Sequence, residues 1–475
     1  MGMKLIVIDK RLSLIFIFFF GLLSQNLFSK TLLEPKDEFF VKKLEYQSFK
    51  KNILIDTTTF PIWTPPIEDS NESLIQIIEN EFIFSNSLSG YFSSELNPLR
   101  GISDNFRDRR SISFSKEIVF DDAYIPEFNA NISLTKNFSP LLDKKISLDG
   151  SYFSVVWPNY VLGIGYMERW WGPAHDNSLV LSNYAYSQPG IFFDSKSGIR
   201  FDNFLSFLGD INFSIFFNRL ENKRGIKNSN FIGTRVTFQP NKNLTFGLSR
   251  ATMFGGENRP DSFEDFFNNL FRLTRSENGQ DISNEIGGYD MKYNFSFNDI
   301  LASFYFQLIG EDEIRFTPSK KIITLGNEFI YFENGLLRSF GLEYSNTIGE
   351  YGDLYNVIYE HSSYTSGYRY KNLPLGAFID NDSIYMKFSS YFELTEDFSM
   401  NLSLFKGDFN EDKVGDKNIW GTNNKKFEGL DLKTKYKINK NLVLENIILV
   451  STEEINFSSL ILDKTTFSLK LTYNF

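Results

Sequence analysis

The chain has 475 residues, a formal net charge of −10, two histidines and no cysteine. An acidic chain without a basic block does not suit nucleic acid, so we expect no nucleic-acid partner. Without cysteine there is no disulfide framework and no thiolate metal site, and His175 and His361 alone are too few for a histidine-rich metal site.

The composition points to strands with two different faces. Phenylalanine is unusually frequent, with 52 residues, and aromatic residues make up 17% of the chain. The mean hydropathy is nevertheless only −0.24. A chain that is aromatic but not hydrophobic overall must interleave apolar and polar residues finely, as period-2 strands between two solvents do.

Residues 1–29 are typical of a secretory signal peptide. Lys4, Lys10 and Arg11 supply a positive start, and an apolar core follows at residues 12–23. The alternative is a membrane anchor helix, but the apolar run is shorter than the ~20 residues that a span needs. We therefore expect the segment to be a signal peptide.

Residues 30–81 have a different character. Pro35 precedes an acidic first turn at Glu38, and Leu44 follows at helical spacing, which predicts a short helix. A proline-rich break follows at residues 61–66, and residues 68–79 form a second short amphipathic candidate. Because this segment is too short for a core of its own, we expect it to pack against or inside the rest of the chain, as a helical plug region.

From about residue 82 to residue 475, apolar and polar residues alternate in strand after strand. Clear examples are residues 128–135, 211–218, 289–298, 398–404 and 432–438. Short polar turns join many strand pairs, and longer polar segments, such as residues 257–281, lie between the pairs. The predicted short turns are Lys136-Asn137, Asn241-Lys242-Asn243, Asn298-Asp299, Glu396-Asp397 and Asn439-Lys440-Asn441. Short turns at one end and long loops at the other are typical of an outer-membrane barrel.

The last strand and the physics of the bilayer support the same fold. Phe467, Leu469, Leu471, Tyr473 and Phe475 form one apolar face, and the chain stops on an aromatic residue, like the signal read by the barrel-insertion machinery. A sheet in hydrocarbon must close on itself, because every backbone group needs a partner. The 394 residues after residue 81 (475 − 81) suffice for roughly 16 to 20 strands. A barrel that wide needs a plug, or it leaks.

Residues 163–190 contain the densest group of candidate functional side chains in the sequence. An alternating strand runs into Glu168, Arg169, Trp170 and Trp171, a Gly172-Pro173 break, and then His175, Asp176 and Asn177. Two adjacent tryptophans, of five in the chain, are costly to leave on an exposed loop. We expect something to cover them or use them.

Three segments together resemble the signature of the Wzi-type capsule assembly family. They read RWWGPAHDNSLVLSNYAYSQPG from Arg169, GLSRATMFGGENRP from Gly247 and YTSGYRYKNLPLGAFIDNDS from Tyr364. The second is similar to that family's S-R-A-x-x-x-G-G-x-x-R-P, and the third to its G-Y-x-Y-x-x-x-x-x-G-x-x-x-D-x-D. All three occur in order, and the helical, proline-broken start also fits. The chain departs from the pattern at Ala174, Ala377, Tyr184 and Tyr186.

The resemblance implies an outer-membrane barrel of about 18 strands with its long loops facing the cell exterior. It also implies a non-enzymatic, lectin-like function, the attachment or assembly of capsular or related exopolysaccharide at the cell surface. The expected partners are that polysaccharide, outer-membrane lipid and the insertion machinery that reads the strand ending in Phe475. No cofactor is implied.

The candidate polysaccharide-binding residues each have a second interpretation. Trp170 and Trp171 either stack on sugar rings or fill the barrel interior, and Asp176 and Asn177 follow them directly. Glu168 and Arg169 favour a structural ion pair of the lumen. Such pairs contribute little net stability when they are wet.

Two further groups complete the candidate site. Arg250 and Arg259 either form a fork for acidic sugars or tie down a long loop. Tyr368, Asp380 and Asp382 either accept sugar hydroxyls, bind Ca²⁺ through oxygen ligands, or build a turn.

Two other function classes compete with polysaccharide binding. His175, Asp176 and Ser178 invite a hydrolase hypothesis, but adjacent His and Asp residues rarely form a triad, and no G-x-S-x-G elbow is present. We therefore expect no catalytic residue. A substrate-specific, porin-like channel for oligosaccharides or small solutes is the stronger alternative, because a wide polar lumen also suits diffusion.

Overall fold

The structure is a computed structural model that describes residues 32–33, 38–63, 86–101, 107–120, 126–139, 144–271, 276–277, 280–281, 283–314, 317–414, 417–423 and 426–475. The predicted signal peptide and the amphipathic candidate at residues 68–79 lie outside the described residues. The boundary at residue 81 does so too, and the division into segments 1–29, 30–81 and 82–475 stays a prediction.

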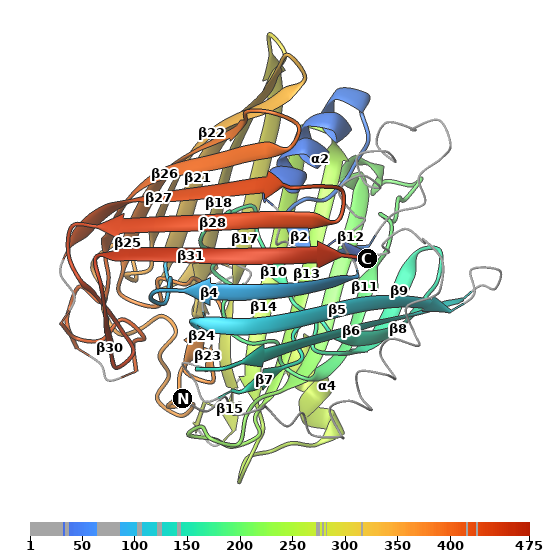
Figure 1. Ribbon diagram of the computed structural model, residues 1–475. Helices are drawn as coiled ribbons and strands as arrows, with labels where there is room; N and C mark the ends of the chain where they lie inside the picture. The colour runs from blue at the N-terminus through green and yellow to red at the C-terminus, as the bar shows by residue number, and fades with distance from the viewer. Residues whose placement is uncertain are drawn as a thin grey trace, which may run out of the picture.

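Antiparallel strands close into a barrel (Figure 1). In chain order the wall contains β4 (Ser87–Ser93), β5 (Arg110–Phe120), β6 (Glu127–Asn137), β7 (Ile146–Ser147), β8 (Tyr152–Val156), β9 (Tyr160–Gly165), β11 (Gly190–Ser195), β12 (Asp210–Arg219), β13 (Asn230–Asn241), β14 (Leu244–Phe254), β17 (Ser283–Phe297), β18 (Ile300–Gly310), β21 (Ile322–Glu333), β22 (Leu336–Asn346), β25 (Ile384–Glu393), β26 (Phe398–Asp408), β27 (Phe427–Lys437), β28 (Leu442–Ser451) and β31 (Thr465–Asn474). Because β7 and β8 both pair with β6, these segments make 18 wall strands. The last strand pairs with the first through Asn474 and Ser87, which closes the wall. The predicted fold class is confirmed.

Alternation along each strand produces the two faces of the wall. In β31, Phe467, Leu471 and Tyr473 are exposed on the outside, whereas the alternate residues Thr466 and Ser468 are buried toward the lumen. An apolar outer face and a polar inner face are what a strand between lipid and a filled interior requires.

The two ends of the barrel differ, as the sequence predicts. Two-residue turns join β17 to β18 at Asn298-Asp299 and β21 to β22 at Asn334-Gly335, and all four residues have positive φ. That conformation suits a type I′ turn, which matches the twist of the flanking strands. This short-turn end contrasts with a long-loop end, whose connections include residues 166–189 and 347–383.

One predicted turn is wrong. Lys136 and Asn137 are the last residues of β6 and pair with Ile112 and Ser111 of β5. They extend the strand because the neighbouring strand offers backbone partners that the local sequence does not reveal.

A helical element lies in the lumen at the short-turn end. Helix α2 (Glu38–Lys51) lies near the same end of the barrel as the C-terminus (Figure 1). The Tyr46 hydroxyl donates to the carbonyl of Asp299 at 3.0 Å, and Lys50 pairs with the Asp299 side chain. The predicted N-terminal plug element is therefore present in the described residues as this helix.

Short strands connect the helix to the rest of the lumen. β1 (Leu32–Leu33) pairs with β3 (Ile62–Trp63), and β2 (Thr59–Phe60) pairs with β10 (Trp170–Trp171). The long loops carry the hairpins β15 (Ser276–Glu277) with β16 (Gln280–Asp281), β19 (Asp312–Ile314) with β20 (Thr317–Ser319), β23 (Arg369–Tyr370) with β24 (Leu373–Pro374) and β29 (Ile455–Phe457) with β30 (Leu460–Leu462). The remaining elements are α4 (Phe263–Phe271) and the 3₁₀ turn η3 (Ser206–Leu208). Within the described residues, every helix is too short or too polar to cross a membrane.

Candidate functional site

The segment between β9 and β11 folds into the lumen, where its described residues are mostly buried. Trp170 pairs with Phe60 and Trp171 with Thr59, so the two tryptophans form the strand β10 beside the plug. Both indoles are buried, at 1% and 0% exposure. Trp170 donates from Nε1 to the Ala174 carbonyl at 2.8 Å, and the ring of Trp171 lies 5.4 Å from that of Phe216. Neither ring face is open to a sugar in this structure.

The charged residues beside the tryptophans are also buried. Arg169 donates to both carboxylate oxygens of Asp194, at 3.1 and 3.2 Å, and to the hydroxyl of Ser214 at 2.6 Å. Its charge is thus neutralised by a wall residue of the neighbouring strand β11. Glu168 is likewise buried.

The polar residues after Gly172-Pro173 are held by a single wall carboxylate. The backbone amides of His175, Asp176 and Asn177 donate to Glu343 on β22 at 2.7, 3.1 and 2.9 Å. The Asp176 carboxylate in turn accepts from Lys387 on β25 at 2.8 Å. Three consecutive amides around one anion form a concave binding site, here filled by the protein itself.

The turn before these residues needs glycine. Gly172 has φ 131°, and a Cβ there would lie 2.6 Å from Nε2 of Gln307. Gln307 donates to the Trp171 carbonyl at 2.9 Å and accepts from the Leu179 amide at 2.8 Å. Gln307 therefore holds both sides of the turn through hydrogen bonds.

The loop between β22 and β25 packs onto the first segment. The rings of Tyr359 and Tyr368 stack at 5.5 Å. Tyr359 donates to the Leu179 carbonyl at 2.5 Å and Tyr368 to that of Val180 at 2.9 Å. Burial raises the pKa of Tyr368 well above its ordinary value, so the ring acts as a neutral donor.

Asp380 and Asp382 hold this loop together. Arg369 donates to Asp380 at 3.0 and 2.8 Å, and both side chains are buried. Asp382 accepts twice from the Asn356 amide, at 3.0 Å each. Burial raises the pKa of Asp382 to about 7 despite these hydrogen bonds. Both aspartates have positive φ, at 58° and 53°, which agrees with the turn interpretation.

Arg250 and Arg259 have different partners. Arg250 points away from the lumen, since Ser249 beside it bonds the lumenal Arg235. Its guanidinium pairs with Glu285 at 2.8 and 2.7 Å on the outside of the wall. Arg259 lies at the long-loop end, 5.3 Å from the ring of Tyr364. The two guanidinium groups do not form one fork here.

Trp420 and Arg107 also contribute to the plug. Trp420, fully buried, donates to the Phe378 carbonyl at 3.1 Å and brings the loop between β26 and β27 into the same core. Arg107 donates to the carbonyls of Asn183, Tyr184 and Ala185 at 2.7, 2.9 and 3.0 Å. No local pattern marks Trp420, because its partners lie in other loops.

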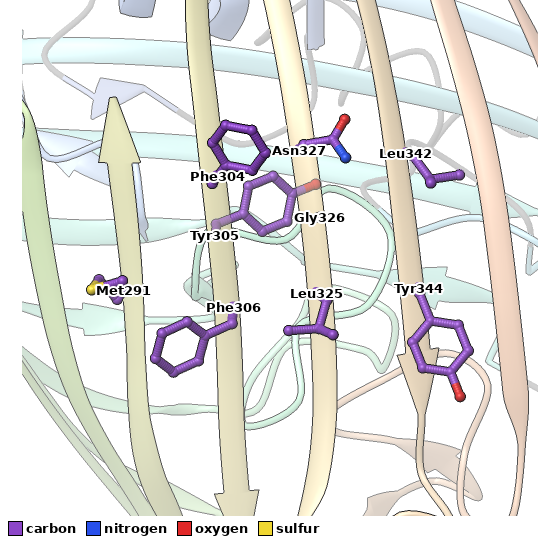
Figure 2. A pocket seen from close by; sticks show the side chains of 9 residues that line it. All are labelled: Met291, Phe304, Tyr305, Phe306, Leu325, Gly326, Asn327, Leu342 and Tyr344. Atoms are coloured by element: carbon purple, nitrogen blue, oxygen red, sulfur yellow. The ribbon is translucent and has the colours of Figure 1, made fainter. Parts of the chain in front are cut away.

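Two cavities of the described residues differ in size and place. Beside Trp170 and His175 the lumen leaves only about 10 Å³, room for about one water molecule. A hollow of about 340 Å³ lies instead on the lipid-facing wall, between the outward rings of Phe304 and Phe306 and the side chains of Leu325 and Leu342 (Figure 2).

Some side chains of the long-loop end remain open to solvent. Tyr351 is 52% and Tyr355 is 39% exposed. Tyr355 lies 3.4 Å from Glu411, and Asn356 bonds Asp412. We call Tyr351, Tyr355, Asn356, Glu411 and Asp412 the rim cluster. Its turn is closed by the Gly349 amide, which donates to the Leu354 carbonyl at 2.9 Å.

A closed barrel with an apolar outer face, a polar interior and a plug built from an N-terminal helix and inward-folded loops defines a plugged outer-membrane β-barrel. Its long loops face the cell exterior and its short turns the periplasm.

Residues 86–458 match the family described as capsule assembly protein Wzi, and the chain belongs to this family. An uncharacterised 55.8 kDa protein in the cps region of Klebsiella pneumoniae is 28% identical over 188 residues, which are 39% of this chain and 37% of that protein.

Among solved structures, the chain is similar to Escherichia coli Wzi, described as a carbohydrate-binding outer-membrane β-barrel involved in group 1 capsule assembly. The TM-score is 0.79 and the identity 19%, over 94% of this chain and all of that one. The Pseudomonas aeruginosa barrel OprD matches more weakly, with a TM-score of 0.46 and 14% identity over 82% of this chain and 93% of that one.

Proposed function

We propose that this protein binds capsular or related exopolysaccharide at the cell surface without catalysis and helps to assemble the capsule there. The observation that carries the proposal is the filled lumen in a chain of this family. Trp170, Trp171, Tyr368 and Asp380, which the family signature marks, are all buried and hold the plug. The Escherichia coli relative is described as carbohydrate-binding, which supports the same ligand class.

The filled lumen favours attachment over a channel. A diffusion path needs continuous water, whereas here ion pairs cross the interior. Lys387 of β25 pairs with Asp176 of the inward-folded segment at 2.8 Å. Arg235 of β13 pairs with Asp290 of β17 at 2.5 Å and also donates to Thr58 of the plug at 2.9 Å. Opening such a path would leave buried charges without partners, which is strongly unfavourable.

The geometry around His175 also speaks against hydrolysis. Nε2 of His175 lies 3.3 Å from Glu328, whereas the hydroxyl of Ser178 donates to the Trp171 carbonyl. Burial, and then the nearby Lys42 and Lys292, hold the pKa of His175 well below its ordinary value. Serine and histidine therefore do not form a nucleophile and base pair.

We propose the rim cluster as the contact surface for the polymer. Exposed tyrosine rings suit the C–H faces of sugars, and the carboxylates of Glu411 and Asp412 accept hydrogen bonds from hydroxyls. Each contact is weak, but a polymer with repeated units binds several copies of the barrel at once and gains avidity. The buried signature residues then act by positioning these loops.

The test is surface retention of polymer in cells that carry variants. Tyr351→Ala with Tyr355→Ala is expected to release polymer into the medium while the amount of barrel in the membrane is unchanged. Lys227→Ala with Glu257→Ala, an exposed ion pair on other loops, is the matched control and retains polymer. Equal retention by both double variants contradicts the rim cluster as the contact surface.

A further inference from the structure

Helix α4 (Phe263–Phe271) lies on the outside of the barrel wall. Phe266 contacts Phe217 edge-on, with ring centroids 5.3 Å apart. Phe217 points outward, because its neighbour Phe216 points into the lumen against Trp171. The same outward ring lies 6.4 Å from Phe254 at the end of β14. The helix therefore packs against the face of the wall that meets lipid.

Both ends of the helix segment are anchored to outward-facing side chains. Before the helix, Asp261 pairs with Arg219 at the end of β12 at 3.2 Å. At its C-terminus, the carbonyls of Asn269 and Leu270 accept from Arg250 at 2.6 and 3.2 Å. A cation that bonds the last carbonyls of a helix satisfies groups that have no partner within the helix.

The position of Arg250 shows how far helix α4 extends along the outer wall, away from the long-loop end. Arg250 lies four residues before Phe254, the last residue of β14, so it is about 13 Å along the strand from the long-loop end. The Arg250–Glu285 pair faces lipid at this depth, yet the two side chains are only 19% and 17% exposed. An uncovered ion pair would be expensive in hydrocarbon.

The wall beside the pair is covered as well. Ile232, Thr252 and Phe254 occupy outward positions of β13 and β14, and all are at most 2% exposed. Farther down β14, the outward Leu248 is 44% exposed, as a lipid-facing residue should be. The outward wall residues are thus shielded from solvent only in the part of the wall near α4.

The helix sequence is strongly one-sided. Apolar residues recur at positions 263, 266, 267, 270 and 271, whereas Glu264, Asp265, Asn268 and Asn269 lie between them. Ser262 and Asp265 form a capping box, with the Ser262 amide donating to Asp265 at 2.7 Å and the Asp265 amide to Ser262 at 3.2 Å. Phe266 faces the wall, but Phe267 is 38% exposed beside it.

We propose that α4 is an interfacial membrane helix that lies in the outer leaflet. It replaces the wall as the lipid-facing surface over the Arg250–Glu285 pair, and Phe267 inserts into the acyl-chain layer. The argument for lipid as the occupant is continuity, because the helix extends the same apolar surface that the outward wall residues present. A one-sided helix with a polar face lies along the interface in this way. The inference does not rest on polysaccharide binding.

The absence of cysteine in the chain makes the test direct, because one introduced cysteine carries one spin label. Labels are placed at Phe267→Cys and Leu270→Cys on the apolar side and at Glu264→Cys on the polar side. Leu248→Cys serves as the lipid reference and Glu257→Cys as the water reference. The full-length barrel is reconstituted in phosphatidylcholine vesicles, and collisions with oxygen and with a water-soluble nickel complex are compared. Folding of each variant is checked by the heat-dependent shift of the barrel on a gel.

The proposal predicts that the labels at 267 and 270 behave like the one at 248, with frequent oxygen collisions and loss of nickel collisions. The label at 264 should behave like the one at 257. If the labels at 267 and 270 meet the nickel complex as often as the label at 264, the helix lies in water and the proposal is wrong. Spin–spin broadening at 267 would identify a second copy as the occupant and also overturn it. Should one apolar-side variant fail to fold, the other decides.

Discussion

The buried pair of Arg369 and Asp380 tests whether the plug depends on Asp380, which the family signature marks, and on its arginine partner. The two side chains are 2% and 0% exposed and share two hydrogen bonds. Asp380→Ala removes the carboxylate and leaves the guanidinium with Glu360, at 2.8 Å, as its remaining anionic partner. Removing one partner of a buried pair destabilises by about 3–5 kcal/mol.

That loss can be measured as local opening of the loop at residues 347–383. A change of about 3–5 kcal/mol raises the open population, and the cleavage rate by a protease, about 100- to 5,000-fold when reclosing is fast. Purified barrel in detergent is digested, and the wall is checked by its heat-dependent gel shift. Asp380→Asn keeps one acceptor and should fall between wild type and Asp380→Ala.

Lys406→Gln provides the matched control. It breaks a pair with Glu428 in which both side chains are more than half exposed, and such pairs contribute about 0–1 kcal/mol. If Asp380→Ala is cleaved within about fivefold of Lys406→Gln, the reasoning about the buried pair is refuted, since about 1 kcal/mol corresponds to that factor.

Three further predictions concern the same plug. Trp171→Ala removes a fully buried ring, and such changes destabilise by about 3–5 kcal/mol, so the midpoint temperature of the barrel's gel shift should fall. Phe207→Ala removes an exposed ring and should leave that midpoint temperature unchanged. Equal midpoint temperatures for the two variants contradict a role of Trp171 in packing. Burial raises the pKa of Asp382 to about 7, so the folded loop favours the protonated carboxyl group. The contribution of this carboxyl group to loop stability is fully present below the unfolded pKa of about 4 and is lost as the pH rises through 7. The loop at residues 347–383 should therefore be cleaved faster at pH 8 than at pH 5 relative to a flexible peptide, and Asp382→Asn should remove the difference; a difference that persists in the variant refutes this assignment. Gly172→Ala should lower the midpoint temperature of the gel shift, because the new Cβ would lie 2.6 Å from Gln307. Gly90→Ala should not lower it, because a Cβ there would have nothing within 4 Å. Similar midpoint temperatures for the two variants contradict the role of Gln307 in holding the turn.

The wall could be predicted because lipid and lumen impose opposite polarity on alternate residues. That pattern is local, so it can be read along each strand without knowing the neighbours. It fails where a strand ends for a non-local reason, as at Lys136 and Asn137, which extend β6 only because β5 pairs with them.

The site could be predicted only in part. Two of the three signature segments, those from Arg169 and from Tyr364, fold into the lumen, but the signature did not show which side chains stay exposed. Asp176 meets Lys387 across 211 residues, and Trp420 meets Phe378 in another loop, so neither contact has a local signal. Arg250, which the sequence suggested as one half of a fork with Arg259, lies on the outer face beside the inward Ser249. The one-sided pattern of residues 263–271 was also present in a segment that the sequence analysis treated as a polar loop.

The most direct test of the central claim, a plugged barrel that binds polymer instead of passing solutes, is the conductance of the purified protein in a planar bilayer. Insertion is verified separately by flotation of the protein with vesicles. The filled lumen predicts that membranes containing the barrel show no steady current steps above the bare bilayer. Large, long-lived steps that long sugars block would contradict the account and favour a channel.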